Sequence, residues 1–204
     1  MKDWKAQKAA RESAAKAMQA AFPNLVPVSE KVDSLNAAAK NMRIELKAAF
    51  PGIKFSVKSR RFSGGDAIDV SWTDGPMAAQ VDEIIDRYTA GSFNGMDDSY
   101  TYARDAWTDA FGDAKYISSQ RKYSAKAVAS AIRTVRAKYG ANLTEAGVGE
   151  VTPEAYESGE YFNLNVIPGG WNNTLQGLIG NELSRRTWAL TKKAEPAQAE
   201  AVAA

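Results

Sequence analysis

The sequence contains no histidine and no cysteine, and these two absences remove several kinds of chemistry. Serine–histidine–aspartate catalysis, cysteine–histidine catalysis, histidine-bound zinc and imidazole pH switches all need residues that this chain lacks. Disulfides and zinc–thiolate sites are excluded as well, which fits a reducing compartment. Carboxylate or lysine acid–base chemistry, a serine or tyrosine paired with lysine, and an oxygen-ligated metal stay open.

Long apolar runs are also missing from the chain. No segment approaches the roughly 18 consecutive apolar residues of a membrane span, so we expect no membrane partner. Residues 1–22 are basic but have no apolar core, and they contain Asp3 and Glu12. They therefore do not have the pattern of a secretory signal or of an organelle presequence. A hydrophobic content of 45% and a charged content of 25% are typical of a globular protein.

The net charge of +2 conceals a strong segregation of charge along the chain. Residues 1–63 hold 13 basic and 5 acidic residues, whereas residues 64–113 hold 2 basic and 11 acidic residues. Residues 114–144 hold 7 basic residues and no acidic residue. Residues 145–204 hold 4 basic and 8 acidic residues. Solvated faces with internal charge pairing are the simplest explanation, and basic surfaces that bind nucleic acid are the alternative.

Helix signals dominate the first quarter of the chain. An Ala/Lys-rich stretch over residues 3–21 predicts a helix with few large apolar residues, and two prolines follow it. A second helix is expected from about Glu30 to Phe50, with Ser29 as its N-cap. We expect three parts in the chain: an N-terminal helix with a Pro-containing linker, a main domain and a disordered tail, at residues 1–28, 29–192 and 193–204.

The stretch SRRFSGGDAIDVSWTDGP contains a Gly-Gly pair between two alternating runs. A phosphate-binding loop would require a helix directly after the glycines, whereas here a second strand pattern follows. Pairing Val57 with Val70 places the apolar residues on one side and pairs Lys58 with Asp69 on the other. We therefore predict an antiparallel hairpin closed by Arg61 and Asp66, with the glycines as turn residues of positive φ rather than a ligand loop.

The stretch SFNGMDDSYTYARDAW is the most unusual part of the sequence, because aromatic residues crowd around short polar pairs. A structural loop anchored by aromatics is one interpretation, and the spacing does not fit an EF-hand calcium loop. If the protein has a recognition surface, we expect it here, because exposed Tyr with Asn and Gly forms effective contacts. The candidate partner-binding residues are Phe93, Asn94, Asp97, Asp98, Tyr100 and Tyr102.

Later in the chain, residues 115–120 predict a third strand, and Ser124 predicts the cap of a helix that ends at Gly140. Three basic residues lie opposite the apolar stripe of that helix and one lies just before it in line with them, which makes a basic ridge of Lys122, Lys126, Arg133 and Arg136. A solvated face is the default interpretation, and phosphate contacts are the alternative. A strand over 161–166 and a helix capped by Asn173 complete the outline. The pattern as a whole predicts an α+β fold, with a small antiparallel sheet packed against several helices.

The runs IELKAAFPGIKFSVKSRRFSGGDAIDVSWTDGP and VDEIIDRYTAGSFNGMDDSYTY, with the landmarks FSV, SGG, VSWTDGP and DSY, resemble the large polyvalent protein-associated domain 29 family. The resemblance covers about residues 38–139 and leaves out the N-terminal helix and the C-terminal third. It implies a protein of a phage, plasmid or conjugative element that acts against host defence in the cytoplasm of a bacterium. It supplies no catalytic residues.

We therefore expect a non-catalytic binding protein that masks a host restriction or CRISPR component, with no cofactor and no metal. The alternative is a nucleic-acid-binding accessory protein that uses the basic ridge and the N-terminal helix. An enzyme would require Asp66, Asp69 and Asp74 to converge with Asp97 or Asp98. The oligomeric state and the identity of the partner stay open.

Overall fold

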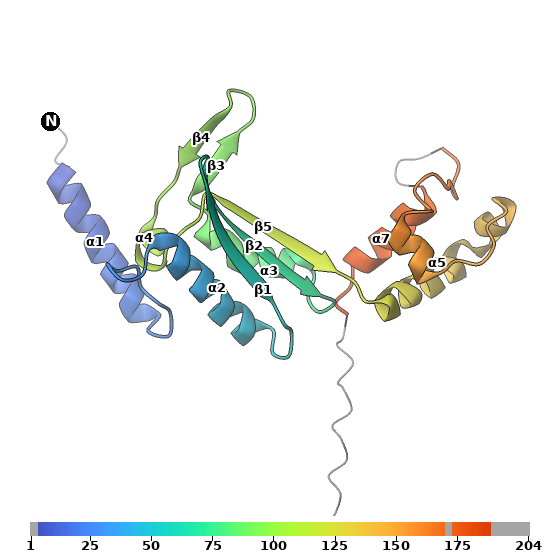
Figure 1. Ribbon diagram of the computed structural model, residues 1–204, viewed down its shortest axis with the longest axis horizontal. Helices are drawn as coiled ribbons and strands as arrows, with labels where there is room; N and C mark the ends of the chain where they lie inside the picture. Colours follow the sequence, from blue (N-terminus) through green and yellow to red (C-terminus); the bar gives the residue numbers. More distant parts are fainter. Residues whose placement is uncertain (1–3, 170–172, 189–204) are drawn as a thin grey trace, which may run out of the picture.

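The computed structural model describes residues 4–169 and 173–188 (Figure 1). It confirms the α+β class, with helices and two small sheets. The α-helices, in chain order, are α1 Trp4–Ala21, α2 Ser34–Ala49, α3 Ala78–Ile85, α4 Ala106–Phe111, α5 Ala125–Glu145, α6 Pro153–Ser158 and α7 Leu175–Ser184. The strands are β1 Ser56–Phe62, β2 Gly65–Thr73, β3 Gly91–Asn94, β4 Ser99–Tyr102 and β5 Tyr116–Lys122. A short 3-10 helix, Asp86–Tyr88, follows α3.

The N-terminal helix α1 packs against α4, so this Ala-rich helix docks on the chain's own core. Arg11 forms a two-pronged ion pair with Asp109, with N–O distances of 2.8 and 2.6 Å. The second predicted helix begins later than expected, because Ser29 forms a small turn with Val32. Asp33 is the true N-cap of α2, since its side chain accepts a hydrogen bond from the Asn36 N–H.

The three-stranded sheet has the order β1-β2-β5. The β1–β2 register is as predicted, with Val57 opposite Val70 and Arg61 opposite Asp66. The ladder extends one pair further, to Phe62 and Gly65, so the turn is shorter than the predicted four-residue loop. Gly65 has the expected positive φ, at 142°, whereas Gly64 does not. Strand β5 joins β2 in parallel, so the third strand does not continue the antiparallel pattern.

One face of this sheet is covered and the other is open. Helices α2 and α3 contact the sheet and each other, and both contribute to the same buried cluster as Ile68, Val70 and Trp72 of β2. The alternate residues point to the opposite face, where β5 shows a regular pattern of exposed positions. The three-stranded sheet therefore presents one uncovered face, which we call the open face.

Strands β3 and β4 form a second hairpin that projects beyond the end of the three-stranded sheet (Figure 1). The sequence pattern predicts a loop anchored by aromatics here, and the paired strands correct that interpretation. Gly91 is essential to the pairing, because a Cβ atom at this position would lie 2.0 Å from the Thr101 carbonyl oxygen.

Helices α5, α6 and α7 surround a second cluster of buried residues, which includes Val128, Ile132 and Ile179. Helix α5 does not stop at Gly140 but continues to Glu145 with a kink at Tyr139. Whether residues 29–192 behave as one domain stays a prediction.

Two sequence predictions in this C-terminal part need correction. The structure describes residues 161–166 and shows no strand there. This stretch contains turns and a bridge between Asn165 and Thr174. Thr174, not Asn173, caps α7. The predicted tail, 193–204, lies outside the described residues.

The two clusters meet where β2 ends. The Arg121 guanidinium donates hydrogen bonds to the carbonyl oxygens of Asp74 and Gly75 on one side, and of Leu183 and Arg186 on the other. Gly75 and Trp188 also exchange two backbone hydrogen bonds of 2.9 Å.

Among the described helices, none is long and apolar enough to cross a bilayer.

Candidate functional site

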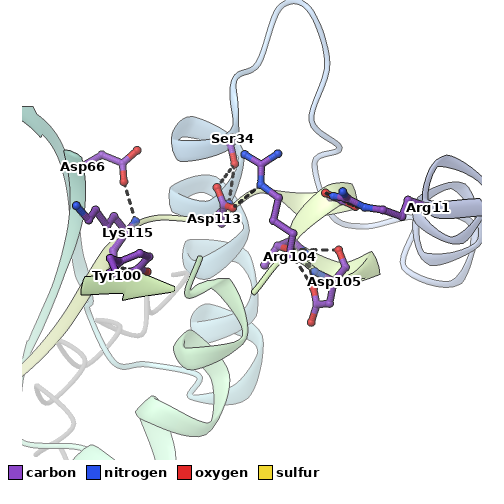
Figure 2. A network of polar contacts seen from close by, with 10 residues as sticks. Arg11, Ser34, Asp66, Tyr100, Arg104, Asp105, Asp113 and Lys115 are labelled. Atoms are coloured by element: carbon purple, nitrogen blue, oxygen red, sulfur yellow. Dashed lines mark hydrogen bonds and ion pairs between the residues drawn. The ribbon is translucent and has the colours of Figure 1, made fainter. Parts of the chain in front are cut away.

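Three of the carboxylates considered for an enzyme, Asp66, Asp69 and Asp74, make local contacts. Asp66 accepts a hydrogen bond from the Lys115 N–H (Figure 2), and Asp74 accepts one from the Ser124 N–H. Asp69 accepts hydrogen bonds from Ser118 and Arg60, and these bonds hold the pKa of its carboxyl group below the usual range. Across residues 4–169 and 173–188, no group of three or more acidic side chains could hold a metal ion.

The predicted partner-binding residues lie together on the β3–β4 hairpin. Phe93 and Tyr100 are cross-strand partners, and Tyr102 faces Gly91, so the three rings share one side of the hairpin. Phe93 is 54% exposed and Tyr102 is 62% exposed. Asn94, Asp97 and Asp98 lie at the tip. There the Asn94 side chain accepts a hydrogen bond from the Met96 backbone N–H.

Two members of this region differ from the sequence-based expectation. Tyr100 is half-buried, and its hydroxyl donates a 2.9 Å hydrogen bond to the Lys115 carbonyl oxygen (Figure 2), so it holds the hairpin against the sheet. Burial raises the pKa of the Tyr100 hydroxyl. Met96, which the prediction omitted, is 98% exposed at the tip.

A polar network fixes the base of the hairpin (Figure 2). The Ser34 hydroxyl, at the start of α2, donates a 2.5 Å hydrogen bond to Asp113 and accepts one from the Asp113 N–H. Arg104, directly after β4, lies 3.9 Å from the same carboxylate. The network therefore ties the end of the hairpin to α2 and to the loop before β5.

Aromatic rings continue from the hairpin onto the open face. The Tyr100 and Tyr116 ring centroids are 6.1 Å apart, and Tyr116 stacks with Phe62 at 6.1 Å and an interplanar angle of 24°. The Lys115 ammonium group lies 5.1 Å from the Tyr100 ring and 5.3 Å from the Tyr116 ring. The sequence did not identify Phe62 and Tyr116 as surface residues, because it predicted Phe62 in the loop of the first hairpin and Tyr116 only as part of the third strand.

The predicted basic ridge is exposed. Lys122 lies at the end of β5, and Lys126, Arg133 and Arg136 follow on α5. Within the described part of the chain, none of these four side chains has an ion-pair partner. Lys122 also pairs in register with Thr73, so it belongs to the open face as well as to the ridge.

A groove of about 420 Å³ lies between α2 and the start of β1. Arg43, Lys47 and Lys54 line it together with Phe55. The Arg43 guanidinium donates to the carbonyl oxygens of Ala39 and Val57, so it is held across the free edge of β1. The groove is basic, and its arginine is already engaged by the fold.

These features define an α+β domain, built on a three-stranded sheet with one uncovered face and a projecting hairpin with exposed rings. Residues 33–124 match the family model described as large polyvalent protein associated domain 29, which confirms the resemblance predicted from the sequence. That description indicates a domain associated with polyvalent proteins of mobile elements. The match includes α2, both sheets and the hairpin, and it ends before α5 rather than at residue 139. No curated protein and no solved structure matches the chain.

Proposed function

We propose that this chain is a non-catalytic binding protein of a mobile element, and that its β3–β4 hairpin captures and masks a host defence protein. The observation that carries the proposal is the exposure of Phe93, Met96 and Tyr102 on one short, projecting hairpin. Large apolar side chains that gather at the surface mark interaction sites, and aromatic residues often contribute most of the binding free energy. A restriction or CRISPR component is the proposed partner.

Three further observations support this function. The family description associates the matched domain with polyvalent proteins, which belong to elements that meet host defences on entry. The carboxylates nearest to the open face make structural contacts, which favours binding over catalysis. The polar network at Ser34 and Asp113 holds the hairpin in place before a partner arrives, which lowers the entropic cost of binding.

Affinity capture from a nuclease-treated host lysate, followed by mass spectrometry and direct titration of the purified partner, tests the proposal. We expect the double substitution Phe93→Ser and Tyr102→Ser to weaken partner binding at least about ten-fold. The matched control is Phe162→Ser, which removes an equally exposed ring from the C-terminal part. Equal binding by the hairpin variant and the control would contradict the proposal.

The alternative function is nucleic-acid binding through the basic ridge, and the exposure of its four unpaired cations favours it. A salt titration separates the two functions. Contacts to phosphates weaken steeply as salt rises, whereas contacts between apolar rings do not.

A further inference from the structure

The open face of the three-stranded sheet is a second candidate surface, which adjoins the hairpin through the contact between Tyr100 and Tyr116. The register fixes which side chains share it, because paired residues point to the same side. On this face β1 presents three large side chains, Lys58, Arg60 and Phe62. Strand β5 presents Tyr116, Ser118, Gln120 and Lys122, all of which are exposed.

Two rings on this face form a flat platform. Phe62 is 44% exposed and Tyr116 is 40% exposed, and they stack at a small interplanar angle. A Cβ atom at Gly65, the register partner of Phe62, would lie 2.7 Å from the Lys115 Cδ atom, so this glycine leaves room for the Lys115 side chain. About two fifths of Phe62 and of Tyr116 thus stays accessible to another planar group. Aromatic platforms of this kind on an open sheet stack unpaired nucleobases.

Positive charge lies along the same face of the sheet. Arg60 and Lys115 lie beside the rings, Lys58 follows on β1 and Lys122 lies at the far end of β5, against a single carboxylate in the centre of this face, Asp69. Arg60 lies 3.0 Å from Asp69, and the Ser118 hydroxyl lies 2.7 Å from it, so this carboxylate is largely neutralised. The Arg60 guanidinium also lies 5.5 Å from the Phe62 ring centroid. The surface thus attracts an anionic ligand that also has flat apolar faces.

We propose that single-stranded nucleic acid binds across the open face, with bases stacked on Phe62 and Tyr116 and phosphates near Lys58 and Lys122. A duplex does not fit this chemistry, because its bases are already stacked and paired and cannot present a face to the rings. This proposal goes beyond the proposed function and does not depend on it, because the rings concerned are different.

Fluorescence anisotropy with the full chain tests the proposal. The probes are a labelled 12-mer of thymidine, a 12-mer of uridine and a duplex of the same length. We expect both single strands to bind more tightly than the duplex, with an affinity that falls as salt rises. A difference between the two single-stranded probes would assign the ligand to DNA or to RNA.

Three variants assign the binding to a surface. The platform variant, Phe62→Ala with Tyr116→Ala, should weaken single-strand binding at least about ten-fold. The hairpin variant, Phe93→Ser with Tyr102→Ser, also loses two exposed rings, as the platform variant does. It should nevertheless bind the oligonucleotide as tightly as the wild type. The ridge variant, Lys126→Gln with Arg133→Gln, should bind within about three-fold of the wild type. Far-ultraviolet circular dichroism checks that each variant is folded.

Several results would overturn the proposal. The first is a wild-type chain that binds neither single strand at low salt. The second is a duplex that binds as tightly as the single strands. A platform variant with undiminished affinity would also refute it, and loss of binding in the ridge variant alone would move the nucleic acid to α5. Loss of protein capture in the platform variant, with no oligonucleotide binding by the wild type, would make the open face a protein contact.

Discussion

At the scale of single residues, one buried amide connects three parts of the N-terminal half. Asn41 on α2 is fully buried, and its side chain accepts a 2.6 Å hydrogen bond from the Val26 N–H. Its NH2 group donates to the carbonyl oxygens of Val26 and Phe111, at 2.8 and 3.1 Å. This one side chain therefore fixes the linker after α1 and the end of α4 against α2. An isolated asparagine in a helix pattern does not reveal such a role in the sequence.

We expect Asn41→Ala to lower the free energy of unfolding by about 2–4 kcal/mol, because it leaves buried backbone groups without partners. Urea denaturation followed by tryptophan fluorescence measures the loss. The control is Asn36→Ala on the same helix, whose side chain bonds to exposed Asp33 and should cost less than about 1 kcal/mol. Equal losses of unfolding free energy in the two variants would show that the buried hydrogen bonds of Asn41 contribute no more to stability than the exposed one of Asn36.

At the scale of elements, the hairpin β3–β4 depends on close approach of its two backbones. At Gly91 a Cβ atom would also lie 2.8 Å from the Tyr102 Cα atom, and backbone cannot move aside as a flexible side chain can. At Gly95, in the turn, the nearest atom to an added Cβ is a Phe93 ring carbon at 3.8 Å, which is an ordinary contact.

We expect Gly91→Ala to disrupt β3–β4 pairing, whereas Gly95→Ala should leave the hairpin intact. Hydrogen exchange of the hairpin amides should become at least about ten-fold faster in the first variant and stay close to wild type in the second. The first variant should also lose partner capture, because Phe93 and Tyr102 would no longer be held on one side. Unchanged exchange in Gly91→Ala would contradict the close approach.

The elements also show how far the sequence could predict this fold. The β1–β2 register was predictable, because the alternation of Val57 and its neighbours permits one pairing that buries the apolar side. The direction of β5 was not, because alternation is the same in parallel and antiparallel strands. The four-residue strands β3 and β4 are short and mostly exposed, so they carry no apolar periodicity.

Of the two candidate surfaces, the sequence could predict one and not the other. The density of aromatic residues located the hairpin rings, and Phe93 and Tyr102 are exposed as that hypothesis requires. The platform of Phe62 and Tyr116 could not be predicted, because it exists only when β5 pairs beside β2. Local patterns therefore identified a surface made by one segment and missed one made by two distant segments.

At the scale of the whole molecule, two hydrophobic clusters meet at a narrow junction near the end of β2. Arg121 binds carbonyl oxygens from both sides of it, and the bridge between Gly75 and Trp188 adds two further hydrogen bonds. α1 lies at one end of the molecule and α5, α6 and α7 lie at the other (Figure 1).

We expect Arg121→Gln to uncouple the unfolding of the two clusters. Differential scanning calorimetry should show two separated transitions, or a distinctly broader one, where the wild type unfolds more cooperatively. The control is the neighbouring Lys122→Gln, whose side chain is exposed and should leave the transition unchanged. A melting curve for Arg121→Gln that overlays the wild type would show that the junction does not depend on this side chain.

The Arg43 guanidinium has a consequence for how copies of this protein behave at high concentration. Strand β1 forms one edge of the sheet, and such edges invite strands of other molecules to add to them. Arg43 donates a hydrogen bond to the Val57 carbonyl oxygen on this edge. The nearby Lys47 and Lys54 repel an identical strand, because they carry the same charge as the basic residues of β1. We therefore expect this edge to resist the addition of a second copy as the concentration of the protein rises.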